Sequence, residues 1–318
     1  MIKSTLNRRS KGIFGKLMPL DIFMGISFAL MWGSAFTAAR IIVEQTPPLT
    51  ISALRFLMAG TMAIVIARSL GQSWNLNSKQ WRATAIIGLC QNALYLGLFF
   101  VGMQWIEASL ATILASMLPL IVTLLDRLFF NKRIKFLGMI GLFLGACGVT
   151  LIMGNHISND IDIRGVIACV IGVFALAIAT LSVRGASLRG NILMIVGLQM
   201  LIGGIILVII SLFFEDWVID WTTTLILALS YTIIVPSLIA TWIWFSLIAR
   251  IGATEASTFH FLNPFFGVAI AALILDETMT FYDYLGVTII SFGILAVQIS
   301  KQRNTKAHDE PNLPNKIL

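Results

Sequence analysis

The side chains that could bind a small molecule lie inside long apolar segments of this sequence. Trp32, Trp242 and Trp244 fall well within such segments, whereas Trp at a lipid interface usually stands near a segment end. An indole N–H inside a membrane needs a hydrogen-bond partner, and its ring is a flat surface on which an organic substrate can stack. Trp32 and one of the pair Trp242 and Trp244 are therefore interpreted either as substrate contacts or as helix-packing residues. The polar candidates in the third segment are Gln91, Asn92 and Tyr95.

A histidine and an amide share one face of the ninth apolar segment. Ala256, His260, Asn263 and Gly267 recur at three- and four-residue spacing, as on one side of a helix. His260 is a candidate for proton coupling because imidazole changes charge near physiological pH; the alternative is a neutral histidine held by hydrogen bonds. Pro264 predicts a break in this helix, which serves either a substrate site or only the shape of the bundle.

Arg55 is a charged residue inside an apolar segment. It lies about five residues from the start of the second segment, roughly 8 Å along a helix. Ionisable groups within a membrane are costly and often functional. Arg55 is interpreted either as a structural residue neutralised by Glu44 or Glu107 at the same end, or as the anchor of a substrate carboxylate.

Small polar residues line one face of the fourth segment. Ser109, Thr112, Ser116, Pro119 and Thr123 recur at helical spacing. Ser and Thr are enriched where membrane helices pack closely, so this stripe is either a packing face or a cavity wall.

Composition indicates the elements that must hold these side chains. Hydrophobic residues make up 58% of the chain, charged residues 12%, and the mean hydropathy is +0.91, which excludes a water-soluble globular protein. Charges and turn formers divide the chain into apolar segments near the ~20 residues that a membrane-crossing helix needs. The alternation of membrane strands is missing, so we predict an all-α polytopic membrane protein with ten transmembrane helices. The segments are 21–42, 50–69, 82–101, 106–126, 136–154, 165–184, 191–213, 223–248, 254–275 and 283–300.

The sequence contains an internal duplication. Residues 108–152 are echoed by residues 253–297 at a constant offset of 145, which pairs Pro119 with Pro264. Equivalent positions are five apolar segments apart, and an odd number of crossings turns the second copy upside down. Inverted repeats of this kind are typical of membrane transporters. The predicted five-helix repeats are residues 21–154 and 165–300.

Glycines recur in the fifth segment. Gly141 and Gly145 stand with Gly138 and Gly148 at spacings that let helix backbones approach closely. We predict that they form either a scaffold contact between the two repeats or a homodimer contact, and the sequence does not separate the two. The cavity is expected between the first, third, fourth, sixth, eighth and ninth segments, with the fifth and tenth as scaffold.

Positive charges indicate the orientation. Of the 22 Lys and Arg residues, all but Arg40, Arg55 and Arg164 fall on the side of the N-terminus if the ten segments alternate. Because cytoplasmic loops carry the excess of Lys and Arg, we predict a multi-pass protein of the inner (plasma) membrane with both termini cytoplasmic. Residues 1–20 then form a basic leader and residues 301–318 a disordered tail. The net charge of +7 reflects this topology, so no nucleic-acid partner is expected.

The sequence has no constellation typical of an enzyme. The histidines His156, His260 and His308 are far apart, and the chain has no metal-ligand spacing, nucleophile motif or phosphate-binding glycine loop placed to act. We therefore expect no catalytic residue, no metal and no cofactor.

Short motifs add a family resemblance. The clearest are Met-Trp-Gly-Ser-Ala-Phe at 31–36, Leu-Arg-Phe at 54–56, Ile-Gly-Ala-Thr-Glu-Ala-Ser at 251–257, Asn-Pro at 263–264 and Leu-Asp-Glu at 275–277. Over about residues 21–300 the sequence resembles the drug/metabolite transporter superfamily, specifically its EamA-type ten-helix branch. The resemblance implies two inverted repeats, a central cavity and secondary transport of small metabolites, most often export. The sequence departs from the usual Gly-Glu-Arg at 131–133, where Lys132 takes the position that Glu277 has in the second copy.

These observations predict a secondary active transporter of small organic metabolites that works by alternating access. A site of indoles, amides and an arginine favours amino acids or related compounds. Efflux of cationic compounds, uptake by a permease, and a membrane scaffold without transport are the alternatives. The expected partners are a small-molecule substrate and the lipid bilayer.

The charge pattern makes a topology prediction. Reporter fusions should place the loops at Asp160 and Asp276 outside the cell, and the loops at Lys132 and Arg250 inside. A cytoplasmic signal from the Asp276 loop would contradict the inverted repeat.

Overall fold

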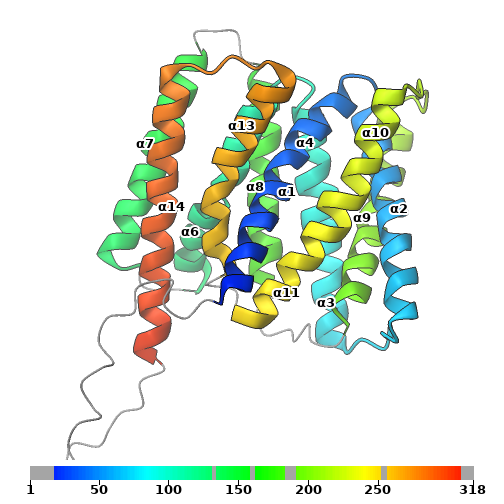
Figure 1. The fold of residues 1–318 in the computed structure, drawn as a ribbon, viewed down its shortest axis with the longest axis horizontal. Coiled ribbons are helices and arrows are strands. Elements are labelled where there is room, and N and C mark those ends of the chain that lie inside the picture. The colour runs from blue at the N-terminus through cyan, green and yellow to red at the C-terminus, as the bar shows by residue number, and fades with distance from the viewer. Residues whose placement is uncertain (1–17, 131–133, 158–161, 183–190, 252–255, 309–318) are drawn as a thin grey trace, which may run out of the picture.

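The computed structural model describes residues 18–130, 134–157, 162–182, 191–251 and 256–308. The regular structure of these residues is helical, and no strand occurs among them (Figure 1). Seven helices are long and apolar enough to cross a membrane, and three shorter apolar helices accompany them. The all-α class is confirmed for the described residues, whereas ten crossings and their inversion stay predictions.

The helices form two successive series. The first comprises α1 (Pro19–Val43), α2 (Pro48–Ser69), α3 (Ser78–Ile87), η1 (Gly88–Leu96), α4 (Gly97–Gly102), α5 (Ala108–Ser116), α6 (Leu118–Phe130) and α7 (Phe136–Ile157). The second comprises α8 (Ile163–Ser182), α9 (Ile192–Phe214), α10 (Thr223–Thr232), η2 (Ile233–Ala240), α11 (Thr241–Ile251), η3 (Ser257–Leu262), α13 (Asn263–Leu275) and α14 (Phe281–His308).

Helix boundaries repeat at the offset found in the sequence. α3 begins at Ser78 and α10 at Thr223, a difference of 145 residues, and the same difference separates the starts of η1 and η2, of α6 and α13, and of α7 and α14. The duplication of structure therefore extends over the third span, which precedes the part of the sequence where the echo is visible.

A π-helical turn interrupts the third and the eighth spans at equivalent positions. In η2, Pro236 has no N–H to give to the preceding turn. The Ser237 Oγ donates to the Thr232 carbonyl of that preceding turn at 2.8 Å, and Thr241 Oγ1 donates to the carbonyl of Pro236 itself at 3.1 Å. Such wide turns often occur at functional sites, and both η1 and η2 contribute to the cavity described below.

The two aligned prolines stand at helix starts. Met117 separates α5 from α6, and the 3₁₀ helix η3 passes directly into α13. Pro119 and Pro264 are the second residues of α6 and α13, where a missing N–H costs little. A break in the helix thus accompanies each proline.

Carboxylates of the second series cap helices of the first. The Glu277 oxygens accept hydrogen bonds from the N–H groups of Ala108 and Ser109, at 2.8 and 2.9 Å, at the start of α5. Glu215 caps the start of α2 in the same way, with two N–H groups at 2.8 and 2.7 Å. Negative charge is favourable at a helix N-terminus, so both contacts are stabilising. Because each carboxylate comes from the second series and each capped helix from the first, they also join the two series. Lys132, the counterpart of Glu277, lies outside the described residues.

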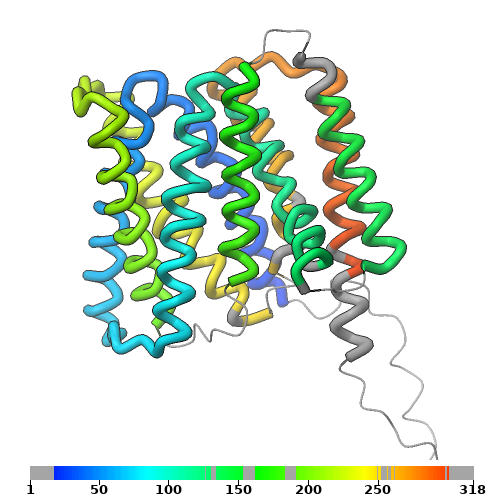
Figure 2. The backbone as a smooth tube through the Cα atoms, turned by 180° about the vertical axis from the view of Figure 1, so that it is seen from behind, coloured from blue at the N-terminus to red at the C-terminus, as the bar shows by residue number. Residues whose placement is uncertain are grey.

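The helices α7 and α14 stand side by side at one edge of the bundle, as both views show (Figures 1 and 2). A Cβ atom on Gly141 would lie 2.5 Å from the Gly293 carbonyl oxygen, and one on Gly148 would lie 2.9 Å from that of Gly286. The backbones therefore touch. Gly145 lies against both neighbours: a Cβ atom added to it would collide with Leu120 of α6, and one added to Gly293 of α14 would lie 2.9 Å from the Gly145 nitrogen. These glycines lie at contacts within one chain, and a homodimer contact stays a prediction.

The bundle has two distinct ends. At the lower end in Figure 1, α1 begins and α11 and α14 end; at the upper end, α13 ends and α2 begins. Arg250 lies in the last turn of α11 and Asp276 directly follows α13, so these two sites are at opposite ends of the bundle. The sites Lys132 and Asp160 lie outside the described residues. The helix α14 continues to His308, past Lys301 where the tail was predicted to begin, and the division into leader, repeats and tail stays a prediction.

The glycine contact makes a stability prediction. Gly141→Leu should overpack the α7–α14 contact and lower the yield of monodisperse protein, with a melting midpoint on the order of 5 °C lower, because overpacking costs about 1–3 kcal/mol. Met139→Leu, at a half-exposed site on the same helix, is the control. Size-exclusion chromatography and thermal unfolding in detergent measure both variants, and an unchanged midpoint for Gly141→Leu would contradict the close contact.

Candidate functional site

A cavity lies near the middle of the bundle, with about 500 Å³ of space not filled by atoms. Part of this space is open to solvent, and in this state the packed side chains leave room for water-sized molecules, so binding of a substrate requires the walls to move apart. The aromatic residues that line it are Trp32, Phe36, Phe56, Tyr95, Phe99 and Phe100. The polar residues that line it are Arg55, Gln91, Asn92, Ser237 and Thr241.

The helices around the cavity differ from those expected. Its lining comes from the first, second, third, seventh and eighth spans, whereas no lining residue comes from the fourth, sixth or ninth span. The prediction that the fourth, sixth and ninth segments form its walls is therefore wrong for this cavity. One residue of each polar stripe is used in packing: Thr112 of α5 lies so close to Gly267 of α13 that a Cβ atom added to the glycine would collide with it.

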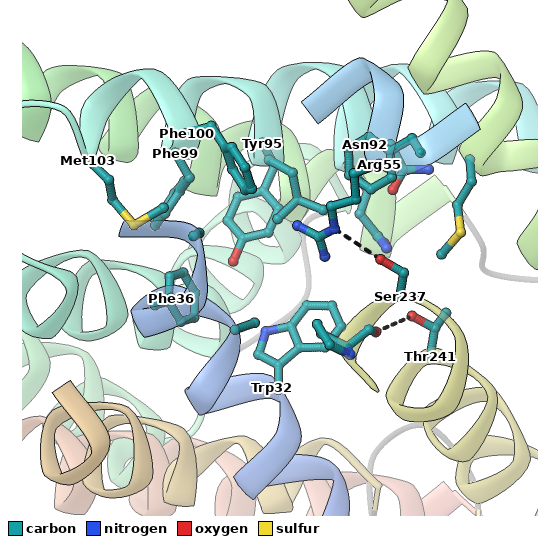
Figure 3. Close-up of a pocket in the computed structure, with 17 residues that line it drawn as sticks. Trp32, Phe36, Arg55, Asn92, Tyr95, Phe99, Phe100, Met103, Ser237 and Thr241 are labelled. Atoms are coloured by element: carbon teal, nitrogen blue, oxygen red, sulfur yellow. Dashed lines mark hydrogen bonds between the residues drawn. The ribbon is translucent and has the colours of Figure 1, made fainter. Parts of the chain in front are cut away.

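Arg55 is the charged group of the cavity. Its side chain is buried with a residue exposure of 4%, and its Nε donates to Ser237 Oγ at 3.0 Å (Figure 3). The guanidinium carbon lies 5.1 Å from the ring centre of Phe56 and 5.6 Å from that of Phe100. Cation–π contacts and one hydrogen bond therefore hold the group in place.

The ion pair expected for Arg55 is not found. Glu44 pairs with Arg40 one helical turn earlier, at 2.8 Å, and the Arg55 side chain extends in another direction, across to η2. Glu107 accepts a hydrogen bond from Ser109 at 3.5 Å. Among the described residues no carboxylate lies within ion-pair distance of Arg55. The prediction failed because spacing along the chain does not reveal the direction in which a side chain leaves its helix.

Two polar groups of η1 have no hydrogen-bond partner among the described residues. They are the Tyr95 hydroxyl and the Asn92 amide nitrogen, and both side chains are almost fully buried. Figure 3 shows the Tyr95 hydroxyl, the Arg55 guanidinium and the Trp32 ring around one open space. An unpaired buried polar group is costly, so a ligand that supplied the partner would gain from it.

The three tryptophans predicted to touch substrate lie in different places. Trp32 lines the cavity. Trp242 is 51% exposed and does not line it. Trp244 stacks on Phe28 with ring centres 4.8 Å apart and meets the His260 ring edge-on at 4.7 Å.

His260 and Asn263 form a pair outside the cavity. The Asn263 side-chain nitrogen lies 2.9 Å from His260 Nδ1, and both residues are buried. The His260 ring also meets Phe28 edge-on at 5.2 Å. Phe28, Trp244 and His260 together are called the aromatic layer. Phe28 precedes Trp32 by one turn of α1, so this layer lies between the cavity and the lower end.

A salt bridge lies beyond the aromatic layer at the lower end. Arg250 Nε of α11 donates to Asp21 Oδ1 of α1 at 2.7 Å, and the Asp21 side chain is buried. One turn of α1 after Asp21, Gly25 lies against the Phe259 ring, which leaves no room for a side chain at position 25. These contacts join α1 to α11 and η3 below the cavity and are called the lower closure. The sequence offered one signal for the pair, an acidic residue at the start of the first apolar segment.

A different contact, called the upper closure, joins α1 to the turn between α4 and α5 at the upper end. Arg40 of α1 donates through Nη1 to the carbonyl oxygens of Met103 and Ile106, the latter at 3.3 Å, in the turn between α4 and α5. Glu44 holds the same guanidinium by its Nε. The cavity thus lies between two closures that both involve α1.

The described residues contain no cluster of three or more His, Cys, Asp or Glu side chains that could hold a metal ion. The functional groups of the site are therefore the guanidinium, amides, hydroxyls and aromatic rings of the cavity, which can bind and orient a small molecule.

Comparison with known proteins identifies the family and its two repeats. The model of the EamA-like transporter family matches residues 20–154 and again residues 163–298. The uncharacterized inner membrane transporter YedA of Escherichia coli strain K12 is 28% identical over 294 residues, covering 91% of this chain and 93% of its own. A WAT1-related chloroplastic protein of Arabidopsis thaliana is 27% identical over 301 residues, covering 91% of this chain and 72% of its own. The uncharacterized transporter YvbV of Bacillus subtilis is 24% identical and covers 87% of this chain.

A solved crystal structure shares the fold. It superposes with a TM-score of 0.64 at 16% sequence identity, over 90% of this chain and 98% of the other.

The placement of the tryptophans makes a binding prediction. Trp32→Ala should weaken the apparent affinity for a transported substrate about tenfold, because the loss of an aromatic wall costs on the order of 1–2 kcal/mol. Trp242→Ala removes the same side chain from outside the cavity and should leave the affinity within about twofold. The concentration dependence of uptake into liposomes measures both, and equal effects would contradict the site.

Proposed function

We propose, from the premise that this chain belongs to the EamA-like transporter family, that it is a secondary active transporter that moves small organic metabolites by alternating access. That the chain is a multi-pass membrane transporter follows from the family and from its apolar helices. Export, an inner-membrane location and a preference for amino acids or related compounds complete the proposal. Its direction is taken from the family resemblance.

The observation that carries the proposal is a cavity with a separate closure on each side. Along α1, Asp21 belongs to the lower closure, Trp32 to the cavity and Arg40 to the upper closure. Alternating access needs a central site and two closures that open in turn. The lower closure consists of a salt bridge and aromatic contacts, and the upper one of hydrogen bonds to backbone carbonyls, so each can open while the other is kept.

The helical framework supports ten crossings in two inverted repeats. The seven long apolar helices and the three shorter ones supply that number. Helix boundaries repeat at an offset of 145 residues, and five spans separate equivalent positions. With both described ends of the chain at the lower end of the bundle (Figure 2), the charge pattern supports cytoplasmic termini.

Two other functions predict different results. Efflux of cationic compounds requires counter-charges in the cavity, yet its lining contains no Asp or Glu. A membrane scaffold predicts no flux of any substrate. Uptake instead of export uses the same site and differs only in the coupling of the cycle.

Transport by purified protein in liposomes tests the proposal. Liposomes loaded with unlabelled amino acids should take up labelled ones by exchange, faster than protein-free liposomes. The absence of exchange for amino acids, organic acids and amines alike would favour the scaffold.

The closures make a prediction about mechanism. In a background where Cys90, Cys147 and Cys169 are replaced by serine, Asp21→Cys combined with Arg250→Cys can be joined by a reducible bifunctional thiol reagent. We expect at least about tenfold slower exchange when the two are joined, with recovery after reduction, because the lower closure must open once in each cycle. Treatment of Asp21→Cys alone is the control, and full exchange in the joined protein would exclude a moving lower closure.

A further inference from the structure

We infer that the cavity selects organic monocarboxylates, and that Arg55 binds the carboxylate while the aromatic walls hold a flat apolar body. The inference rests on the proposed function, since it concerns the same site, and it replaces the preference for amino acids with one for carboxylates that have no ammonium group. It predicts an order of affinity: a monocarboxylate binds more tightly than the corresponding zwitterion, and the zwitterion more tightly than an amide or a cation.

The charge of the lining carries the first step. Arg55 is its one charged residue, and no carboxylate of the described residues lies within ion-pair distance of the guanidinium. Arg keeps its charge in proteins, so a cation buried here gains strongly from an anion in the cavity. A carboxylate binds a guanidinium with two parallel hydrogen bonds, which fixes its orientation as well as its charge.

The geometry of Arg55 leaves the required donors available. Only Nε is used in a hydrogen bond within the described residues, to Ser237 Oγ, which itself donates to the Thr232 carbonyl. Ser237 therefore orients the guanidinium, and the rings of Phe56 and Phe100 hold it from the sides. In Figure 3 the terminal nitrogens point into the space above the Trp32 ring.

The neighbouring polar groups favour an acceptor as the ligand. The Asn92 amide nitrogen can only donate, and the Tyr95 hydroxyl can donate; both lack a partner among the described residues. A carboxylate has two acceptor oxygens and satisfies more than one such donor. An ammonium group would meet the charge of Arg55 with no carboxylate in the lining to offset the repulsion.

The rest of the lining selects an apolar body. Trp32, Phe36 and Phe99 present rings to the cavity, and Met103 and Met200 supply flexible thioether side chains. A substrate with a carboxylate at one end of a short carbon chain and an aromatic ring at the other matches this lining, with the carboxylate at Arg55 and the ring against Trp32.

A set of four ligands with one common skeleton tests the order of affinity. They are 3-phenylpropionate, L-phenylalanine, 3-phenylpropionamide and phenethylamine, titrated onto full-length protein in lipid nanodiscs at up to millimolar concentrations. Tryptophan fluorescence and the thermal midpoint report binding. We expect 3-phenylpropionate to bind at least about tenfold more tightly than its amide, as charge-assisted hydrogen bonds imply.

Variants assign the preference to Arg55. Arg55→Gln should abolish the difference between the carboxylate and its amide, and Arg55→Lys should retain part of it because the charge stays. Arg68→Gln removes a cation from an exposed position on the same helix and should leave the preference unchanged. If Arg55→Gln does not yield folded protein, the order of the four ligands on the unmodified protein and the reduced preference of Arg55→Lys decide.

The outcomes separate this inference from the proposed function. If the amide or the amine binds as well as the carboxylate, if the carboxylate does not bind, or if Arg55→Gln keeps the preference, the inference is overturned even where exchange in liposomes occurs. If the carboxylate binds through Arg55 but no ligand is exchanged, the site assignment stands and the transporter proposal fails.

Discussion

Backbone groups inside a bilayer must find their partners within the protein, and this requirement shapes the centre of the bundle. Pro236 removes a donor from the eighth span, and the hydroxyls of Ser237 and Thr241 satisfy carbonyls around it. Because Ser237 is held by its own backbone contact, it offers Arg55 an acceptor in a fixed position. The guanidinium then lies within cation–π distance of the Phe56 and Phe100 rings in the lining of the cavity. A local repair of the helix thus places the charge on which the chemistry of the cavity depends.

Much of the framework could be predicted from the sequence. An apolar run near 20 residues has few alternatives to a crossing helix, so the segments match the helices closely. Polar and aromatic residues inside such runs were also informative, because Trp32, Arg55, Asn92 and Tyr95 all line the cavity. Within a membrane a polar side chain is retained only where the protein interior has a use for it.

The rotation of each helix about its axis could not be predicted. In a soluble protein the apolar face marks the core, but here the lipid-facing and the buried surfaces are both apolar. Trp242 and Trp244 illustrate the difficulty. Two positions along a helix rotate the side chain by about 200°, so the two rings leave nearly opposite sides of the helix. Trp242 is exposed, while Trp244 stacks in the aromatic layer. The Asn263 side-chain nitrogen pairs with His260 Nδ1, whereas its amide oxygen has no partner among the described residues, and neither residue lines the cavity. The partner of Arg55 comes from a distant part of the chain that no local spacing could reveal.

The glycine contacts of α7 and α14 have a symmetry of their own. Gly141 meets Gly293 and Gly148 meets Gly286, and an offset of 145 residues carries the first contact onto the second. Each half therefore presents a self-complementary patch, and the two patches are joined as in an isologous interface between identical subunits. A patch that is already occupied by its equivalent within the chain is not free to bind a second molecule. Any homodimer of this protein must then be built on another surface.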